Sequence, residues 1–239
     1  MENKTDNKIV KIKNVSKSYG STEVFKDFSL EIPSGKIIGL LGENGIGKTT
    51  LLNMIADLTK PDDGKILVNW HEVSRHTRDS VSYLTRPEHH TSSFKIKHLI
   101  AAANDMHPDF DMQKAERLCE NFKIDVKKGI DKLSKGHQER VCLMLCLARK
   151  APLYVMDEPM AGFDPKFKRE LVSAILTHID EGQTVIISTH LLRDLDSVFD
   201  EVVVLTKNRA HTANADELRE SGRSLEDYYM EVLDNEDAD

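Results

Sequence analysis

The stretch Gly42-Glu43-Asn44-Gly45-Ile46-Gly47-Lys48-Thr49-Thr50 decides the fold of this chain. An apolar run at 36–41 leads into it, and a run at 51–56 that is compatible with a helix follows it. The glycines and the Lys-Thr pair have the G-x-x-x-x-G-K-[ST] spacing of a phosphate-binding loop between a strand and a helix. A glycine-rich turn that only joins strand to helix does not require Lys-Thr at this offset, and the glycines do not fit the dinucleotide pattern G-x-G-x-x-G. The stretch therefore predicts a site for a nucleoside triphosphate.

Each residue type in this loop has a physical role in binding phosphate. Gly42, Gly45 and Gly47 can adopt backbone angles that other residues avoid, and they leave room for N–H groups to converge on phosphate oxygens. The following helix directs its free N–H groups and the positive end of its dipole at the same anion. Lys48 supplies a mobile cation for the β- and γ-phosphates, and the Thr49 hydroxyl can ligate Mg²⁺.

Length, composition and charge limit the classes of protein that this chain can be. With 239 residues, 39% hydrophobic and 31% charged, it has the size and balance of a soluble α/β domain with an insertion. A formal charge of −7 argues against a general nucleic-acid binder. The sequence has neither an apolar run long enough to span a bilayer nor an apolar signal region at 1–6. We therefore expect a cytoplasmic protein that reaches a membrane only through a partner.

The order of apolar patterns predicts an α/β fold with a mainly parallel sheet. Expected strands lie at 8–15, 24–32, 36–41, 65–68, 81–85, 153–156, 184–188 and 202–205. Expected helices follow the loop and lie at 96–105, 112–122, 137–150, 166–180 and 191–198. The segments 1–86 and 151–210 would form one core with antiparallel strands at its N-terminal end, 87–150 an inserted helical subdomain, and 211–239 a helical segment with an acidic tail.

The three cysteines show no spacing typical of a metal or redox site. Cys142 and Cys146 are four residues apart in an apolar helical run, so we expect them to share a buried face.

A second chemical signal is the pair of adjacent carboxylates that ends the apolar stretch Leu153-Tyr154-Val155-Met156. Active groups of open α/β sheets lie at the carboxyl ends of their strands. Asp157 is placed to hold Mg²⁺, and Glu158 to orient or deprotonate the attacking water. The structural alternative, a strand that simply ends in Asp-Glu-Pro, becomes weak once the same chain carries a phosphate-binding loop.

The segment 132–140 contains a helix start at which Ser134 is a good N-cap. A helix start can bind an anion, but taken by itself this one reads as an ordinary cap.

Considered together, these motifs resemble the nucleotide-binding subunit of ABC transporters over about residues 8–210. The resemblance depends on their order: the phosphate-binding loop, then Leu133-Ser134-Lys135-Gly136-His137-Gln138, which is similar to the family signature, then Val155-Met156-Asp157-Glu158-Pro159. Ala161-Gly162-Phe163-Asp164 follows, similar to the D-loop, and Ser188-Thr189-His190, similar to the switch-histidine motif. The resemblance implies a P-loop NTPase core of the RecA-like type.

The resemblance also implies roles for individual residues. Two subunits would dock head-to-tail, with ATP and Mg²⁺ between the loop of one subunit and the signature helix of the other. The implied catalytic residues are Lys48, Glu158 and His190, and the implied metal ligands are Thr49 and Asp157. Tyr19 would stack on adenine. The implied contacts to the nucleotide across the interface are Ser134, Lys135, Gly136 and Asp164.

Two positions depart from the family pattern. Arg86 stands where the family usually has a glutamine that contacts the metal and the attacking water, and a guanidinium cannot ligate Mg²⁺. Arg86 would instead contact phosphate or a carboxylate, or Glu88 would take over the role. Lys135, with His137, replaces a commoner glycine and glutamine. Lys135 would either reinforce the phosphate contact in trans or project into solvent.

The expected function is an ATPase that powers a membrane transporter, docked on the cytoplasmic face of the membrane through an integral-membrane subunit. The second ATP-binding subunit would make a homodimer or a heterodimer, and no nucleic-acid partner is expected. The short helical region, with Ser134 only 86 residues after Lys48, resembles exporters. The region 87–103 would contact the membrane subunit, and 225–232 would pack on the core or support dimer contacts. The alternatives are a soluble ABC ATPase that acts on ribosomes or DNA, and a nucleotide kinase, which explains neither the signature nor the switch histidine.

Overall fold

The computed structural model describes residues 7–87, 94–160, 165–190 and 195–236 of the chain. Its centre is a six-stranded sheet in the order β10-β9-β3-β8-β7-β6. These strands are β3 (Ile37–Leu41), β6 (Val81–Tyr83), β7 (Leu153–Asp157), β8 (Thr184–Ser188), β9 (Glu201–Thr206) and β10 (Arg209–Asn214). Neighbouring strands from β9 to β6 are parallel, and only β10 runs antiparallel to its neighbour.

A second, four-stranded antiparallel sheet has the order β2-β1-β4-β5. Its strands are β1 (Lys8–Tyr19), β2 (Thr22–Pro33), β4 (Asp63–Val68) and β5 (His71–Glu72). The sequence pattern predicted that the first strand ends before Lys17, but β1 continues to Tyr19, where it pairs with Thr22 across a tight hairpin. The hairpin bends at Gly20, whose φ of 60° lies in the left-handed region.

The parallel strands of the central sheet are apolar on both faces because both faces are covered. Tyr154 and Met156 of β7 point to one core, whereas Leu153 and Val155 of the same strand point to the other. The helix α1 (Lys48–Ile55) follows the phosphate-binding loop and packs between the two sheets through Leu51, Leu52, Met54 and Ile55. The loop is therefore held between two buried layers.

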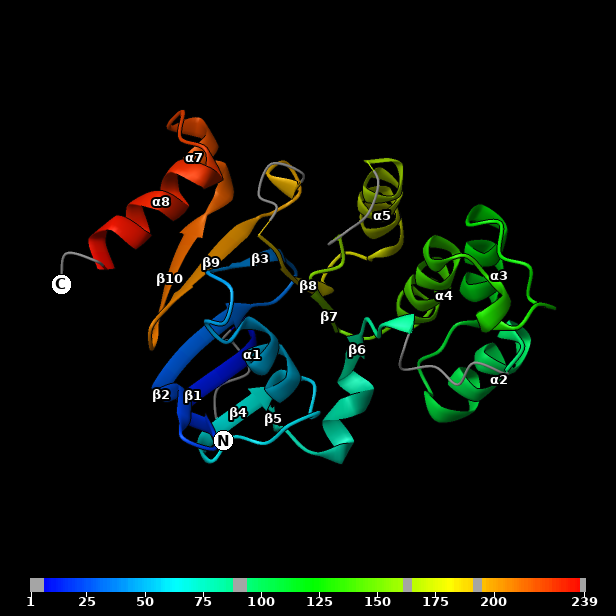
Figure 1. Cartoon of the computed structure of the whole chain (residues 1–239), viewed down its shortest axis with the longest axis horizontal. Coiled ribbons are helices and arrows are strands. Elements are labelled where there is room, and N and C mark those ends of the chain that lie inside the picture. Colours follow the sequence, from blue (N-terminus) through cyan, green and yellow to red (C-terminus); the bar gives the residue numbers. More distant parts are fainter. Residues whose placement is uncertain (1–6, 88–93, 161–164, 191–194, 237–239) are drawn as a thin grey trace.

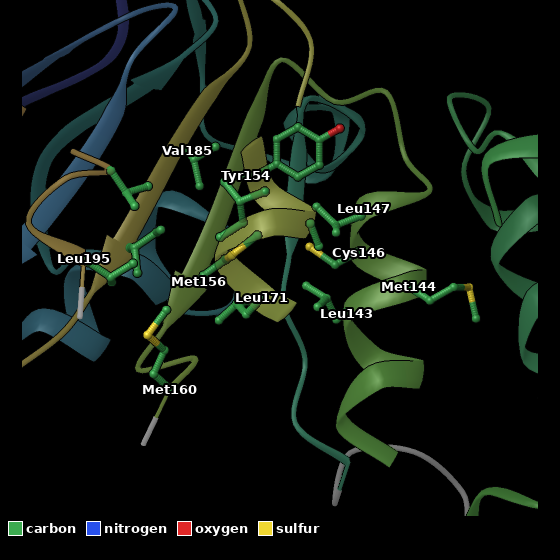
Figure 2. Packing of buried hydrophobic residues seen from close by; sticks show 14 of the residues in the cluster. Leu143, Met144, Cys146, Leu147, Tyr154, Met156, Met160, Leu171, Val185 and Leu195 are labelled. Atoms are coloured by element: carbon green, nitrogen blue, oxygen red, sulfur yellow. The ribbon is translucent and has the colours of Figure 1, made fainter. Parts of the chain in front are cut away.

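Helices cover the other face of the central sheet, with α4 (Lys135–Leu147) and α5 (Pro165–His178) next to its strands (Figure 1). The helices α2 (Ile96–Met106) and α3 (Met112–Asn121) pack against α4 on the side away from the sheet. Two short 3₁₀ turns are η1 (Arg75–Ser80) and η3 (Ile130–Lys132). Figure 2 shows Leu143 and Leu147 of α4 pointing toward Tyr154 and Met156 of β7. Cys146 lies in the same layer, and Cys142 is also buried, which confirms the expected shared face.

A buried arginine joins the helical block 96–147 to the central sheet. The Arg149 side chain is 6% exposed, and its Nε donates to Asp109 Oδ1 at 3.0 Å in the turn between α2 and α3. Its Nη1 donates to the Val81 carbonyl at the start of β6, and its Nη2 donates to the Asp79 carbonyl in η1. One guanidinium therefore satisfies groups on both sides of the junction, as its five donors allow.

The C-terminal segment differs from the expected continuous helix. Residues 209–214 form β10, which pairs with β9 across the turn Lys207-Asn208, where Asn208 has φ 63°. Its side chain accepts a hydrogen bond from the Lys26 backbone N–H at 2.9 Å, which ties this hairpin to β2. The helices α7 (Ala215–Glu220) and α8 (Leu225–Glu236) follow and lie beside β9 and β10 (Figure 1).

The outcome for the remaining fold predictions is mixed. The α/β class, the parallel core, the antiparallel N-terminal strands and the helices between β6 and β7 are confirmed. Leu225 and Val232 are buried in the core, in line with the expected packing. Most of the expected helix at 191–198 lies outside the described residues, and the exact domain boundaries stay a prediction. Among the described helices, none is long and apolar enough to cross a bilayer.

Candidate functional site

The phosphate-binding loop connects β3 to α1 and depends on glycine at two crowded positions. A Cβ on Gly42 would lie 2.8 Å from the Leu205 carbonyl oxygen, and one on Gly47 would lie 2.7 Å from the Phe25 ring. Both residues also have positive φ, of 147° and 113°. Gly45 has φ 85° in open space, so only its conformation requires glycine. The loop thus presents its backbone, without side chains, to its pocket.

Lys48 is the first residue of α1, and its side chain folds back over the loop. Its Nζ donates to the carbonyl oxygens of Gly42 at 2.6 Å and Glu43 at 3.1 Å. Burial lowers the pKa of Lys48, and the nearby carboxylates of Glu158 and Asp157 oppose that shift. The ammonium group is therefore bound to the start of the loop and interacts electrostatically with both acidic residues.

Asp157, the last residue of β7, has both carboxylate oxygens bonded to hydroxyl groups. Thr49 Oγ1 donates to Asp157 Oδ2 at 2.8 Å, and Ser188 Oγ donates to Oδ1 at 2.6 Å. The second of these contacts was not predicted, although Ser188 is the first residue of the predicted switch-histidine motif Ser188-Thr189-His190. The signal available was its position at the end of a strand adjacent to the acidic pair.

Glu158 extends beyond β7 in an unusual backbone conformation, with φ 47°. Its backbone N–H donates to Ser188 Oγ at 2.8 Å and to the Ser188 carbonyl at 3.2 Å. Its carboxylate oxygen Oε2 lies 2.9 Å from His190 Nδ1, so the structure brings the two predicted catalytic side chains into contact. A non-glycine residue in the left-handed region at such a site is typical of a functional constraint.

The predicted signature residues lie at the start of α4. Ser134 is the N-cap, but its hydroxyl contacts His137 Nδ1 at 2.8 Å instead of capping the helix with its side chain. Ser134 and Lys135 are exposed, and Gly136 is half-buried. Arg140 fastens this end of α4 to α5 through Glu170, with Nη2 to Oε2 at 2.7 Å. The segment is therefore a rigid helix start that faces outward.

Tyr19 lies at the tip of the β1–β2 hairpin and is half exposed. Lys17 Nζ stands 5.3 Å from the centre of its ring. Val24, which lies on the other strand of this hairpin, lines the pocket at the phosphate-binding loop. The predicted aromatic platform is thus on the element that borders the loop.

Two separate pockets meet at Glu158. The first lies at the loop and is lined by Val24, Asn44, Gly45, Gly47, Lys48, Thr49, Thr50 and Glu158. The second lies between β6, β7, α4 and α5 and includes Arg86, Lys135, Asp157 and Glu158. Within the described part of the chain, Ser134 and Gly136 line neither pocket. The signature residues thus do not complete the loop of their own chain.

Arg86, the position that departs from the family pattern, is exposed at the rim of the second pocket. Burial raises the pKa of the neighbouring Tyr83 to about 12, with a further increase from Asp157 and an opposing effect of Arg86. Arg86 and the acidic pair Asp157 and Glu158 therefore line the same pocket, beside Tyr83. Asp164 and Glu88 lie outside the described residues, so their roles stay predictions.

Comparison with known proteins supplies the family. The family described as ABC transporter matches residues 25–161, more than half of the chain. The chain belongs to the ABC transporter ATP-binding family. Members are ATPases coupled to transport, which confirms the expected enzyme class.

The relatives include proteins named for import and for export. The chain is 32% identical over 209 residues to the sulfate/thiosulfate import ATP-binding protein CysA of Synechocystis sp., covering 83% of this chain and 58% of that longer protein. It is 30% identical over 211 residues to the lipopolysaccharide export system ATP-binding protein LptB of Haemophilus influenzae, covering 82% and 86%. These names leave the direction of transport open for this chain.

A solved structure of the ATP binding subunit of an ABC transporter has the same fold. It superposes with a TM-score of 0.83 at 24% sequence identity, covering 94% of this chain and 99% of that one.

Proposed function

We propose that this chain is the motor subunit of an ABC exporter, in which ATP closes a head-to-tail dimer and hydrolysis reopens it. The observation that carries the proposal is the polar network at one edge of the central sheet. There Thr49, Asp157, Glu158 and His190 are joined by short hydrogen bonds next to the glycine loop. Such an arrangement suits phosphoryl transfer, in which positioning and charge neutralisation supply most of the catalysis.

The residues at this edge fit ATP and Mg²⁺. Gly42 and Gly47 pack so closely against Leu205 and Phe25 that no Cβ fits, and their positive φ sets the path of a loop whose backbone N–H groups can bind phosphate oxygens. Thr49 Oγ1 and Asp157 Oδ2 lie 2.8 Å apart, and such oxygen donors suit Mg²⁺. We propose that Thr49 holds the ion and that Asp157 holds it directly or through water. When bound, Mg²⁺ would neutralise charge on the β- and γ-phosphates.

Glu158 is the proposed general base for the attacking water. Its carboxylate projects into the loop pocket from a fixed backbone, and His190 Nδ1 holds its Oε2. A base in such a position typically contributes about 10²–10⁴-fold to the rate. His190 would thus orient Glu158 and stand where it can contact the γ-phosphate, and Lys48 would bind the phosphates from the opposite side.

The site is proposed to need a second copy of this chain. Ser134, Lys135 and Gly136 begin an outward-facing helix and do not line the loop pocket of their own chain. A helix start of this kind binds an anion that reaches it from outside. Because each chain carries both halves of the site, two copies docked head-to-tail would form two complete sites, with Asp164 coupling them at the interface.

An apolar groove offers a docking place for an integral-membrane subunit. It is lined mainly by α2 and by residues 81–85 in and after β6. Its rim carries Met106, which is 71% exposed, and Leu58 of the segment after α1, which is 58% exposed. Its volume of about 410 Å³ can accept apolar side chains of a partner helix. The groove includes Leu99, Ala102 and Ala103 of the expected docking region 87–103. Binding there would place the chain on the cytoplasmic face of the membrane.

Export is the proposed direction. The relative named for lipopolysaccharide export is covered over 86% of its length, whereas the import relative is longer. The short helical region between Lys48 and Ser134 supports the same direction.

Purification with its natural partners tests the proposal. The chain should fractionate with an integral-membrane protein and hydrolyse ATP, and substrate should leave the cytoplasmic side in reconstituted vesicles. Fractionation with ribosomes or DNA would contradict the transporter role, and ATP-driven uptake would contradict only the direction.

A further inference from the structure

Ser188 at the end of β8 is fully buried, with 0% of its surface exposed, and its hydroxyl lies between the two acidic residues of the site. We propose that Ser188 is a positioning residue that fixes Asp157 and Glu158 together for metal binding and hydrolysis. This inference rests on the proposed function, because it assigns Ser188 a part in that same reaction.

The geometry gives the hydroxyl of Ser188 two separate tasks. It donates to Asp157 Oδ1 at 2.6 Å, and it accepts a hydrogen bond from the Glu158 backbone N–H at 2.8 Å. Since a hydroxyl has one donor and two acceptor positions, both contacts can form at once. The first contact holds Oδ1, so Asp157 Oδ2 is directed toward Thr49 and the proposed metal position.

The second contact stabilises a backbone that is otherwise unfavourable. Glu158 has φ 47°, and a residue other than glycine persists in the left-handed region only when its surroundings hold it there. The Glu158 N–H has both the hydroxyl and the carbonyl of Ser188 as acceptors. This conformation is what directs the carboxylate of Glu158 toward His190.

The short segment 188–190 therefore holds both the backbone and the carboxylate of Glu158. Ser188 binds its backbone, and His190, two residues further on, binds its carboxylate. Between them, the Thr189 N–H donates to the Leu40 carbonyl of β3 at 3.2 Å, next to the phosphate-binding loop. The segment thus links the ends of β3, β7 and β8, which carry the loop and both acidic residues.

Ser82 provides a matched control. It lies in β6 of the same sheet, is 1% exposed, and its hydroxyl donates to the Cys146 carbonyl at 2.8 Å. Ser82→Ala removes a buried hydroxyl and its hydrogen bond to Cys146, whereas Ser188→Ala removes a buried hydroxyl and two hydrogen bonds at the acidic pair. A role limited to stability would give both variants the same activity.

The test compares Ser188→Ala with Ser82→Ala in the full chain without a membrane subunit, because Ser82 also lines the apolar groove. Ser188→Ala should lower kcat by about ten- to hundredfold and raise the Mg²⁺ concentration needed for half-maximal nucleotide binding by a similar factor, as loss of an outer contact to a metal ligand does. Binding of ATP in the presence of EDTA should not change, because the loop is intact. Ser82→Ala should match the parent in all three measurements.

A conservative variant keeps the test decisive if Ser188→Ala does not fold. Ser188→Thr retains the hydroxyl and should restore most of the Mg²⁺ response, whereas Ser188→Cys, with a weaker donor, should not. The role of Ser188 is overturned if an active protein shows the same kcat and Mg²⁺ response for Ser188→Ala as for Ser82→Ala. A parent chain that binds ATP but does not hydrolyse it would instead contradict the proposed function, while the Mg²⁺ titration would still test Ser188.

Discussion

The edge of the central sheet that carries Asp157, Glu158 and His190, called here the catalytic edge, differs from the groove beside α2 in polarity, hydrogen bonding and exposure. At the edge, side chains from the ends of β7 and β8 and from the start of α1 are joined by hydrogen bonds of 2.6–2.9 Å. At the groove, the lining is mostly apolar and large side chains such as Met106 are exposed. The edge is organised within one chain, whereas the groove has a surface that only another protein can cover.

This difference suits the edge to catalysis and the groove to the binding of a partner protein. Polar groups fixed in advance suit a reaction that every member of the family performs. An apolar surface carries shape and area, which suit a partner that differs from one transporter to another. Changes at the edge should therefore affect turnover without affecting the binding of the membrane subunit, and changes in the groove should do the reverse.

Glu158→Gln should have the largest effect, because it removes the proposed base and keeps the shape of the side chain. We expect turnover to fall about 10²–10⁴-fold, with ATP still bound. Steady-state phosphate release and nucleotide binding would measure the two effects. Glu181→Gln, at an exposed turn after α5, is the control and should retain parental turnover. Hydrolysis by Glu158→Gln at the parental rate would exclude Glu158 as the base.

Arg149→Met should separate stability from catalysis. The substitution leaves Asp109 and three backbone carbonyl groups without their shared donor, so we expect a loss of about 3 kcal/mol in the free energy of unfolding. Urea unfolding would measure it. Lys150→Ala removes the neighbouring ion pair with Asp111, in which the lysine is 60% exposed, and should cost less than about 1 kcal/mol. Equal losses of stability in the two variants would refute the role of Arg149 in joining the helical block 96–147 to the central sheet.

Met106→Glu tests the groove side of the comparison. A charge placed at this apolar rim would have to be buried on docking, so we expect membrane-subunit binding to weaken by at least about tenfold. Basal ATP hydrolysis by the free chain should not change. Met230→Glu on α8 is the control, since Met230 is also exposed, at 49%, but lies away from the groove. Unchanged co-purification of Met106→Glu would show that the partner docks elsewhere.

Asp111 should give a small effect with a defined pH dependence. Its carboxylate caps α3 by accepting from the Lys114 N–H, and this bond, with a contact from Lys150, lowers the pKa of Asp111 from 3.8 to about 2. Stability from this charge is therefore complete above pH 3.8 and is lost as pH falls through about 2.

Asp111→Ala should thus cost about 1 kcal/mol at pH 7. The difference from the parent should shrink between pH 4 and pH 2, as measured by unfolding at several pH values. A difference that stays constant over that range would assign the effect to helix propensity instead of the charge.

Much of the catalytic edge could be predicted from the sequence because its motifs are local. The loop needs glycine, lysine and threonine at fixed offsets, and Asp157 with Glu158 ends an apolar strand. Contacts between distant segments were less accessible. Nothing in the sequence around Ser188 states that its hydroxyl faces Asp157, since that depends on the register of β8 against β7.

The C-terminal segment and the groove are two other features that could not be predicted from the sequence. Residues 209–214 form an edge strand that lacks alternation of branched apolar residues, so its pairing with β9 was not visible in the pattern. The groove arises where α2 meets the end of α1, and no contiguous motif encodes it. By contrast, the parallel strands were predictable because burial on both faces makes them apolar throughout.

Sedimentation of Glu158→Gln with ATP and Mg²⁺ tests most directly the claim that the loop is half of a composite site. The mass should double from 27.1 kDa when ATP is added, because the site stays loaded and closed. Adding Ser134→Arg to the same chain should keep the mass at 27.1 kDa although ATP still binds. ATP-loaded Glu158→Gln that stays monomeric, or a double variant that dimerises as well as the single one, would contradict the account.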